Sequence, residues 1–336
     1  MKRLAITMGD PGGIGPEITV KAITYPEVKK ICTPFVIGDI YIIQEALNLL
    51  KIPLKLRKIK SIKDSIPDKK ILDVIHVIPP TPPSKKFKKF TTKTIKNNSP
   101  TSEGGKASVS YIKTAVELVL SKQVDGIVTA PISKEALKMA GFKWPGHTEM
   151  LANLTKTKDY AMMLVGGPLK IILVTIHTAL KNVPGLITKK KILKTILLAK
   201  KACDMLKIKN PKIAVAGLNP HAGESGIFGD EEVKKILPAI KEAKKYGICV
   251  SGPYPPDTVF YRAYRGDVDI VVCMYHDQGL IPLKMIAFES GVNVTVGLPF
   301  IRTSPDHGTA YDIAWKGIAN PSSMIESIKL AARLKI

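Results

Sequence analysis

Residues 213–224 read IAVAGLNPHAGE, and this stretch sets the pattern for the whole chain. An apolar run typical of a buried strand leads into a turn that carries a histidine, a glycine and a carboxylate. Two other apolar runs end in the same way, residues 171–176 at His177 and residues 270–275 at His276. Three histidines, including His221, therefore stand at the carboxyl-terminal ends of strand-like segments.

Strand-like and helical patterns alternate along the chain, which predicts an α/β fold with a largely parallel sheet. Ligands of such folds bind outside the carboxyl ends of the strands. We therefore expect His177, His221 and His276 to converge on one crevice. Three neutral imidazoles that leave one coordination position open are a catalytic arrangement for a zinc-like cation. The alternative is that they are unrelated polar residues at the start of loops.

Composition places the chain among folded proteins. Its 336 residues suffice for two domains, 45% are hydrophobic and 24% are charged. No apolar run approaches the roughly 20 residues of a membrane span, and no signal-peptide pattern follows the first methionine, so we expect no membrane partner. None of the four cysteines forms a C-x-x-C pair, which predicts free thiols and a cytoplasmic protein: Cys32, Cys203, Cys249 and Cys273.

The formal net charge of +23 raises the possibility of a nucleic-acid partner. However, the lysines are spread over helical segments together with glutamates, and only 6% of residues are aromatic. A surface that stacks bases combines basic and aromatic side chains, and no such pattern is present. We therefore expect a solvated lysine-rich surface and no nucleic acid. A basic cleft for a small anionic substrate remains compatible with this charge.

A glycine-rich turn and several embedded polar residues point to ligand binding. The turn at residues 9–17 follows a strand and precedes a helix, where backbone N–H groups can meet a phosphate, although Asp10 interrupts any G-x-G-x-x-G pattern. Lys284, Asn293 and Arg302 lie in apolar sequence and suit an anionic substrate, or are surface charges. Neither a G-x-S-x-G motif nor a Walker A loop is present.

Six motifs together make the chain resemble the family of 4-hydroxythreonine-4-phosphate dehydrogenases of vitamin B6 biosynthesis. They extend nearly from end to end of the chain: GDPGGIGPE (9–17), GHTE (146–149), NPHAGE (219–224), YHDQGL (275–280), GVNVTVG (291–297) and LPFIRTSPDHGTA (298–310). The resemblance implies an isocitrate/isopropylmalate dehydrogenase-like fold, with two α/β/α domains flanking a cleft. We expect residues 1–130 with 290–336 to form the first domain, and residues 131–289 the second, which carries the metal histidines.

The resemblance also assigns residues. It implies a homodimer in which His276 reaches into the partner subunit's site, beside His177 and His221 as the other metal ligands. The implied substrate contacts are His147, Thr148, Lys284, Asn293 and Arg302. A loop similar to the NAD-binding loop of isopropylmalate dehydrogenases gives the cofactor residues His307, Gly308, Thr309 and Asp312. Asp277 is the candidate proton acceptor, and Asn219 with Glu224 is expected to hold the imidazole of His221.

The implied reaction is the NAD- or NADP-dependent oxidation of 4-phosphohydroxy-L-threonine at C3, assisted by zinc, magnesium or cobalt. The β-keto acid that forms, 2-amino-3-oxo-4-phosphooxybutanoate, then loses CO2. Many family members have a proline two residues after the first metal histidine, where this chain has Ala179. This departure leaves open a dehydrogenase of 4-phospho-D-threonate or 4-phospho-D-erythronate. A phosphotransacetylase-like acyltransferase is the alternative from a different class of enzyme.

Overall fold

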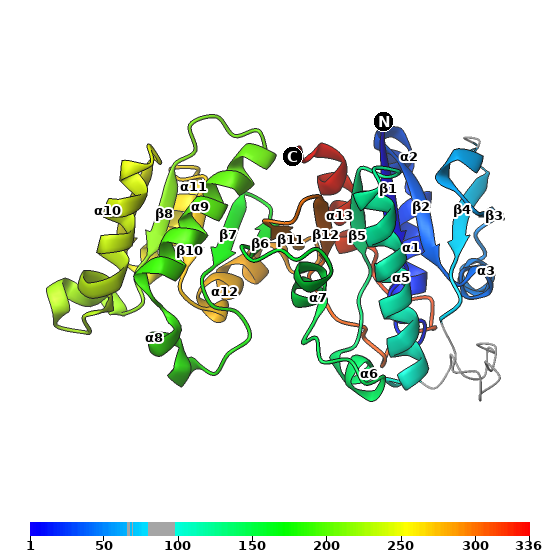
Figure 1. Ribbon diagram of the computed structural model, residues 1–336, viewed down its shortest axis with the longest axis horizontal. Coiled ribbons are helices and arrows are strands. Elements are labelled where there is room, and N and C mark those ends of the chain that lie inside the picture. The colour runs from blue at the N-terminus through cyan, green and yellow to red at the C-terminus, as the bar shows by residue number, and fades with distance from the viewer. Residues whose placement is uncertain (66–67, 69, 80–97) are drawn as a thin grey trace. The chain divides into compact units, whose positions relative to one another are not determined.

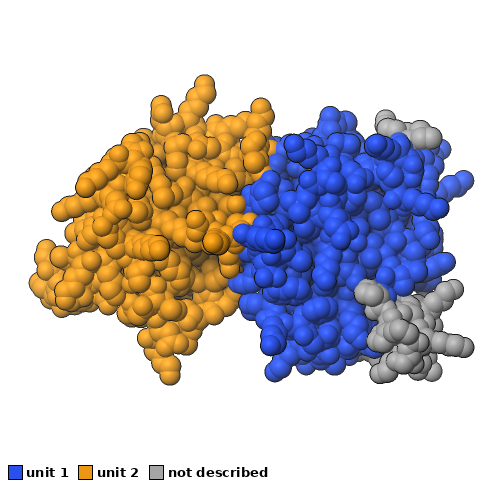
Figure 2. All heavy atoms as spheres, viewed as in Figure 1, with its two compact units in different colours: residues 1–156, 298–333 blue, residues 157–297, 334–336 orange. Residues whose placement is uncertain are grey.

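The computed structural model describes residues 1–65, 68, 70–79 and 98–336. The chain forms two compact units. Unit 1 comprises residues 1–156 and 298–333, and unit 2 comprises residues 157–297 and 334–336 (Figure 2). These limits differ from the expected boundaries because the helices over residues 134–154 pack against the long helix at residues 102–120 of the first unit.

Unit 1 is built on a parallel sheet with the strand order β3-β4-β2-β1-β5-β12 (Figure 1). The strands are β1 (Lys2–Thr7), β2 (Cys32–Gly38), β3 (Lys55–Ile59), β4 (Ile71–His76), β5 (Gly126–Thr129) and β12 (Ile301–Pro305). The helices are α1 (Gly15–Thr24), α2 (Pro26–Ile31), α3 (Ile40–Leu49), α5 (Ser102–Leu120), α6 (Lys134–Met139), α7 (His147–Leu154) and α13 (Ser322–Arg333).

The helices of unit 1 lie on both faces of its sheet. Helix α1 packs against α3 and α13, whereas α5 packs against β1, β2 and β5. Helix α1 connects β1 to β2, whereas α5 connects β4 to β5, which runs in the opposite direction along the sheet. Because crossovers between parallel strands are right-handed, these two helices lie on opposite faces. Unit 1 therefore has the three layers of an α/β/α fold, as the sequence predicted.

Unit 2 has a mixed sheet in the order β11-β6-β7-β10-β8-β9, antiparallel at β11–β6 and β6–β7. Its strands are β6 (Ala161–Gly166), β7 (Leu169–Leu173), β8 (Ile213–Ala216), β9 (Val250–Tyr254), β10 (Ile270–Cys273) and β11 (Val292–Val296). Its helices are α8 (Val183–Leu186), α9 (Lys189–Met205), α10 (Leu237–Lys245), α11 (Pro256–Arg265) and α12 (His276–Ala287). Strand-like runs on both sides of Gly166 and Gly167 predict a hairpin, which the antiparallel pairing of β6 with β7 confirms; Gly167 has φ 53°.

Two groups of helices pack on the sheet of unit 2. Alternate residues of β7, Leu169, Ile171 and Leu173, join a buried cluster with residues of α11 and α12. Helix α9 also packs on β7 and β10, together with α10. Because successive strand residues point to opposite faces, a continuous apolar strand requires cover on both sides. The buried strands that end at the three histidines are therefore central strands.

The sequence of residues 310–316 predicts a short helix, and this prediction is wrong. Residues 310–316 form successive turns, because Ala310 (φ 41°) and Trp315 (φ 61°) both have left-handed backbone conformations. Residues 79–102 are polar and rich in proline and lysine, which predicts an exposed excursion, but this segment lies largely outside the described residues, since residues 80–97 are not described. Within the described ranges, no helix combines the length and apolar character that crossing a membrane requires.

Candidate functional site

Three neighbouring parallel strands of unit 2 carry the three histidines beyond their carboxyl ends. Strand β10 lies between β7 and β8 and pairs in parallel with both. His177 follows β7, His276 follows β10, and His221 follows β8. Adjacent strands lie about 4.8 Å apart, so this topology brings the three loops to one edge of the sheet. The predicted placement of the histidines at strand ends is confirmed.

His177 and His276 lie side by side. Their ring centroids are 5.7 Å apart, with a tilt of 41° between the ring planes. His276 begins α12, and its Nδ1 lies 2.7 Å from Asp277 Oδ1. A carboxylate on one imidazole nitrogen fixes the tautomer and leaves Nε2 for a metal, as is usual for ligating histidines. Asp277 thus contacts the His276 ring while most of its own side chain is exposed.

His221 lies in a turn of unusual conformation. The turn spans Pro220–Gly226, and the His221 ring centroid is 6.0 Å from that of Phe228. Within the part of the chain that the structure describes, no three His, Cys, Asp or Glu side chains are close enough to hold a metal ion. The donor chemistry nevertheless fits a divalent cation, because the imidazoles of His177 and His276 are neighbours and a carboxylate orients that of His276.

Asn219 and Glu224 do not have the expected role of holding the imidazole. The Asn219 amide donates from Nδ2 to Glu231 Oε2 and Glu232 Oε2, both at 2.9 Å. Glu224 is exposed. Asn219 thus joins its loop to two glutamates that begin the next helical segment.

In unit 1, one of the candidate substrate residues is a buried arginine. Arg302 on β12 is 1% exposed, and its Nε and Nη2 donate to Thr129 Oγ1 at 3.2 and 2.7 Å. Burial lowers the pKa of the Arg302 guanidinium to about 9, against which the charge of Glu149 acts. The guanidinium therefore stays cationic at neutral pH. A buried cation bonded to a neutral hydroxyl suits an anionic ligand.

His147 and Thr148 begin α7 in the same unit. The Nε2 atom of His147 is buried and has no hydrogen-bond partner among the described residues. Burial, followed by the charge of Arg302, holds the pKa of His147 well below its usual range. His147 is therefore neutral at pH 7, with a ring nitrogen available for a ligand. Thr148 is buried beside it in the first turn of the helix.

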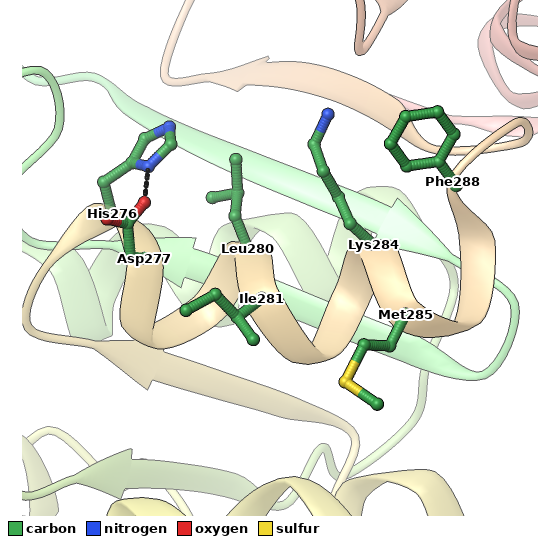
Figure 3. A pocket seen from close by; sticks show the side chains of 7 residues that line it. All are labelled: His276, Asp277, Leu280, Ile281, Lys284, Met285 and Phe288. Atoms are coloured by element: carbon green, nitrogen blue, oxygen red, sulfur yellow. Dashed lines mark hydrogen bonds and ion pairs between the residues drawn. The ribbon is translucent and has the colours of Figure 1, made fainter.

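Lys284 and Asn293 belong to unit 2. Lys284 lies two helical turns after His276 on α12, with Nζ 5.4 Å from the ring centre of Phe288. Figure 3 shows His276, Lys284 and Phe288 along one side of this helix, which borders a groove of about 420 Å³. Asn293 on β11 has a buried Oδ1 that accepts no hydrogen bond within the described residues. An orphaned buried acceptor is costly unless a ligand or water satisfies it.

The candidate cofactor loop contacts the first glycine-rich turn in unit 1. Ile14 N donates to Thr309 O at 2.9 Å, and a Cβ on Gly13 would lie 2.9 Å from that oxygen. Asp312 is exposed, as are His307 and Gly308. The exposed carboxylate of Asp312 and the open space around Gly308 fit the ribose and phosphate parts of a dinucleotide.

Sequence reasoning missed the residue that joins these two loops. Asp10 is 1% exposed, and its carboxylate accepts from Tyr311 Oη at 2.8 Å and from Gly12 N at 2.9 Å. Burial raises the pKa of Asp10 despite these two hydrogen bonds. The signal in the sequence was the acidic residue that interrupts the glycine pattern.

The chain matches a known protein family over most of its length. The family model for the pyridoxal phosphate biosynthetic protein PdxA matches residues 30–331. The chain belongs to this family. It is 46% identical over 330 residues to a 4-hydroxythreonine-4-phosphate dehydrogenase of Desulforapulum autotrophicum, covering 98% of this chain and 94% of the relative. It is 43% identical to a D-threonate 4-phosphate dehydrogenase of Pectobacterium atrosepticum, with 99% of each chain covered.

Solved structures agree with this membership. The crystal structure of 4-hydroxythreonine-4-phosphate dehydrogenase from Klebsiella pneumoniae superposes with a TM-score of 0.86 at 42% identity, covering 98% of each chain. The family resemblance and the expectation of a dehydrogenase-type oxidoreductase are confirmed. A β-decarboxylating dehydrogenase from Thermococcus kodakarensis shares the fold, with a TM-score of 0.52 at 15% identity. The predicted isocitrate dehydrogenase-like fold class is confirmed.

Proposed function

We propose that the chain oxidises 4-phosphohydroxy-L-threonine at C3, using NAD or NADP and a divalent metal. The product, 2-amino-3-oxo-4-phosphooxybutanoate, decarboxylates to 3-amino-2-oxopropyl phosphate on the route to pyridoxal 5'-phosphate. The observation that carries this proposal is the set of histidines beyond β7, β10 and β8, with His177 and His276 5.7 Å apart, in a chain 46% identical to a relative of that name. The free thiols of Cys32, Cys203 and Cys273 support a cytoplasmic location.

The proposed metal ligands are His177, His221 and His276, and the metal is zinc, magnesium or cobalt. When bound, the metal and the nicotinamide supply Lewis-acid stabilisation of developing negative charge and a hydride acceptor, respectively. The chain's own residues orient and neutralise the substrate. Asp277 holds the tautomer of His276 and is our candidate acceptor for the hydroxyl proton, because most of its side chain is exposed.

The phosphate of the substrate is proposed to bind Arg302, with His147 and Thr148 beside it. Arg302 supplies a buried positive charge that is hydrogen-bonded to the Thr129 hydroxyl, and the neutral ring of His147 offers one further polar contact. Lys284 and Asn293 are the proposed substrate contacts of unit 2. The cofactor is proposed to contact His307, Gly308, Thr309 and Asp312 in the loop that the Asp10–Tyr311 hydrogen bond holds.

A second copy of the chain is proposed to cover α11 and α12. Large apolar side chains are exposed on these helices, and they line grooves of about 420 and 480 Å³: Tyr261, Tyr264, Ile281, Met285, Ile286 and Phe288. An exposed apolar patch of this kind marks a protein interface. His276 borders the same groove (Figure 3), so a partner that buries the patch would also meet this histidine. This supports a homodimer with His276 contributed across the interface.

Initial rates test this function. We expect NADH formation from 4-phosphohydroxy-L-threonine that requires a divalent metal, measured with NAD and NADP and with zinc, magnesium and cobalt in turn. A higher kcat/KM for 4-phospho-D-threonate or 4-phospho-D-erythronate would instead support the second candidate, which the Pectobacterium relative and Ala179 favour. Acyl transfer to phosphate without NADH formation would support the phosphotransacetylase-like alternative, for which the structures show only a shared fold.

A further inference from the structure

The turn that carries His221 has a left-handed backbone over five consecutive residues. Their φ values run from 40° to 78°, and only Gly223 among them is a glycine. For residues with a Cβ, this conformation costs roughly 1–2 kcal/mol each. Strained backbone persists only where the surrounding structure determines it. Some group outside the turn must therefore hold it.

Glu232 is the group placed to do so. It is 2% exposed, and its Oε1 accepts from Leu218 N at 2.7 Å and from Asn219 N at 2.8 Å. Its Oε2 accepts from Asn219 Nδ2 at 2.9 Å. These three bonds fix the two residues that lead into the turn. Charge-assisted bonds of this kind are about twice as strong as neutral ones.

The carboxylate also fills the space under the turn. A Cβ on Gly223 would lie 2.6 Å from Glu232 Oε2, and a Cβ on Gly217 would lie 3.1 Å from Oε1. Glu232 thus contacts the chain on both sides of His221. It begins a π-helical turn, Glu232–Ile236, a conformation that is rare and frequent at functional sites.

A second buried side chain ties this loop to the strand end of His276. Gln278 donates from Nε2 to Gly217 O, and its Oε1 accepts from Met274 N, both at 2.6 Å. Thr175 Oγ1 donates to Met274 O at 2.7 Å, two residues before His177. The backbones of the three histidine loops are therefore linked by buried hydrogen bonds, with Glu232 at the His221 end.

We propose that Glu232 is a positioning residue that holds the left-handed turn in the metal-free chain and so sets the affinity of the His221 site for a divalent metal. The inference rests on the proposed metal function of His221. Glu232 accepts hydrogen bonds from the loop and is not itself a ligand. Its effect on the metal is exerted through the backbone that aims the imidazole.

The test is the affinity of the full-length, metal-free chain for Co²⁺ alone, measured by calorimetric titration and by cobalt absorbance. Outer-shell residues typically contribute 10- to 100-fold to metal affinity. We expect Glu232→Gln, which keeps one acceptor oxygen, to weaken Co²⁺ binding about 10-fold, and Glu232→Ala about 100-fold. Gly223→Ala should also weaken binding, because its added methyl group would lie too close to Glu232 Oε2. Glu242→Gln, at an exposed ion pair with Lys189 in the same unit, is the matched control and should change nothing.

Amide hydrogen exchange of the metal-free variants separates positioning from general destabilisation. We expect faster exchange at Leu218 and Asn219 in both Glu232 variants, with strands β7 and β10 still protected. Wild-type Co²⁺ affinity in folded Glu232→Ala or in Gly223→Ala would overturn the inference while leaving the metal function intact. Co²⁺ binding by the wild type that His221→Ala leaves unchanged would overturn the metal function itself.

Discussion

Two candidate sites differ in how far their side chains are exposed. The arginine pocket of unit 1 is Arg302 with its neighbour Thr129, and the histidine edge of unit 2 is the set of three strand-end histidines, His177, His221 and His276. Arg302 lies on a strand, is 1% exposed and donates hydrogen bonds from its guanidinium to Thr129. His177 and His221 lie in exposed turns, and the side chain of His276 is one-third exposed. The pocket contains a buried cation, to which we propose that the substrate phosphate binds. The edge is the proposed metal site, and in our proposal a metal and a second chain complete it.

The largest effect is expected at the histidine edge. His221→Ala should abolish divalent-metal binding and turnover, because two remaining imidazoles cannot form a three-ligand site. The fold should persist, since His221 is exposed and lies outside the core. Metal content after dialysis, turnover and thermal unfolding check this prediction. Retained stoichiometric metal with normal rates would remove His221 from the site.

The pocket gives the next largest effect. Arg302→Met should lower kcat/KM for the phosphorylated substrate about 100-fold, because a buried charge-assisted contact is worth roughly 3 kcal/mol. The melting temperature should be unchanged or higher, since an apolar side chain of similar volume avoids burying a charge. Co²⁺ affinity should not change. The exposed Arg333→Met is the control in the same unit, and an equal loss there would mean that charge alone is responsible.

A substitution in the exposed apolar patch of α11 and α12 should affect the histidine edge but not the arginine pocket, because only the edge is proposed to need a second chain. Met285 is 83% exposed on α12, so Met285→Asp should fold but should not dimerise. At concentrations where the wild type is dimeric, we expect activity to fall at least tenfold, following the weakened metal site. Binding of inorganic phosphate to the Arg302 pocket should remain. Sedimentation velocity measures the oligomeric state, and titration with inorganic phosphate measures binding at Arg302. Leu197→Asp on α9 is the control. A fully active monomer would refute a site that is shared between two chains.

The smallest effect is a pH dependence of stability. The pKa of His147 is held well below its usual range, so below about pH 6.5 the unfolded chain binds a proton there that the folded chain does not. This contribution to stability is present above that pH and is lost on acidification. In His147→Gln, the fall in melting temperature on acidification should be smaller by roughly 2 °C. Identical pH profiles for the two proteins would contradict the buried, neutral histidine.

The sequence predicted the sheet and the positions of the histidines because both depend on local pattern. Apolar runs bounded by turn residues identify β7, β8 and β10, and parallel topology then aligns their carboxyl ends. The hairpin at Gly166 and Gly167 was predicted for the same reason.

The details that failed depend on residues far away in sequence. The expected helix at 310–316 does not form, because Glu17 accepts from the backbone N–H groups of Trp315 and Gly317, and Asp10 accepts from Tyr311. Nothing in the NPHAGE motif indicates five left-handed residues; that conformation is associated with the carboxylate of Glu232, which no local pattern marks as buried. Tertiary hydrogen bonds overrode local propensity at both places.

The most direct test of the metal-dependent dehydrogenase is NADH formation from 4-phosphohydroxy-L-threonine by chelator-treated protein, before and after a divalent metal is restored. We predict no turnover before and full turnover after the addition, with no recovery in His221→Ala. An undiminished rate in the metal-free protein would contradict the central claim, because the strand-end histidines would then have no metal to hold.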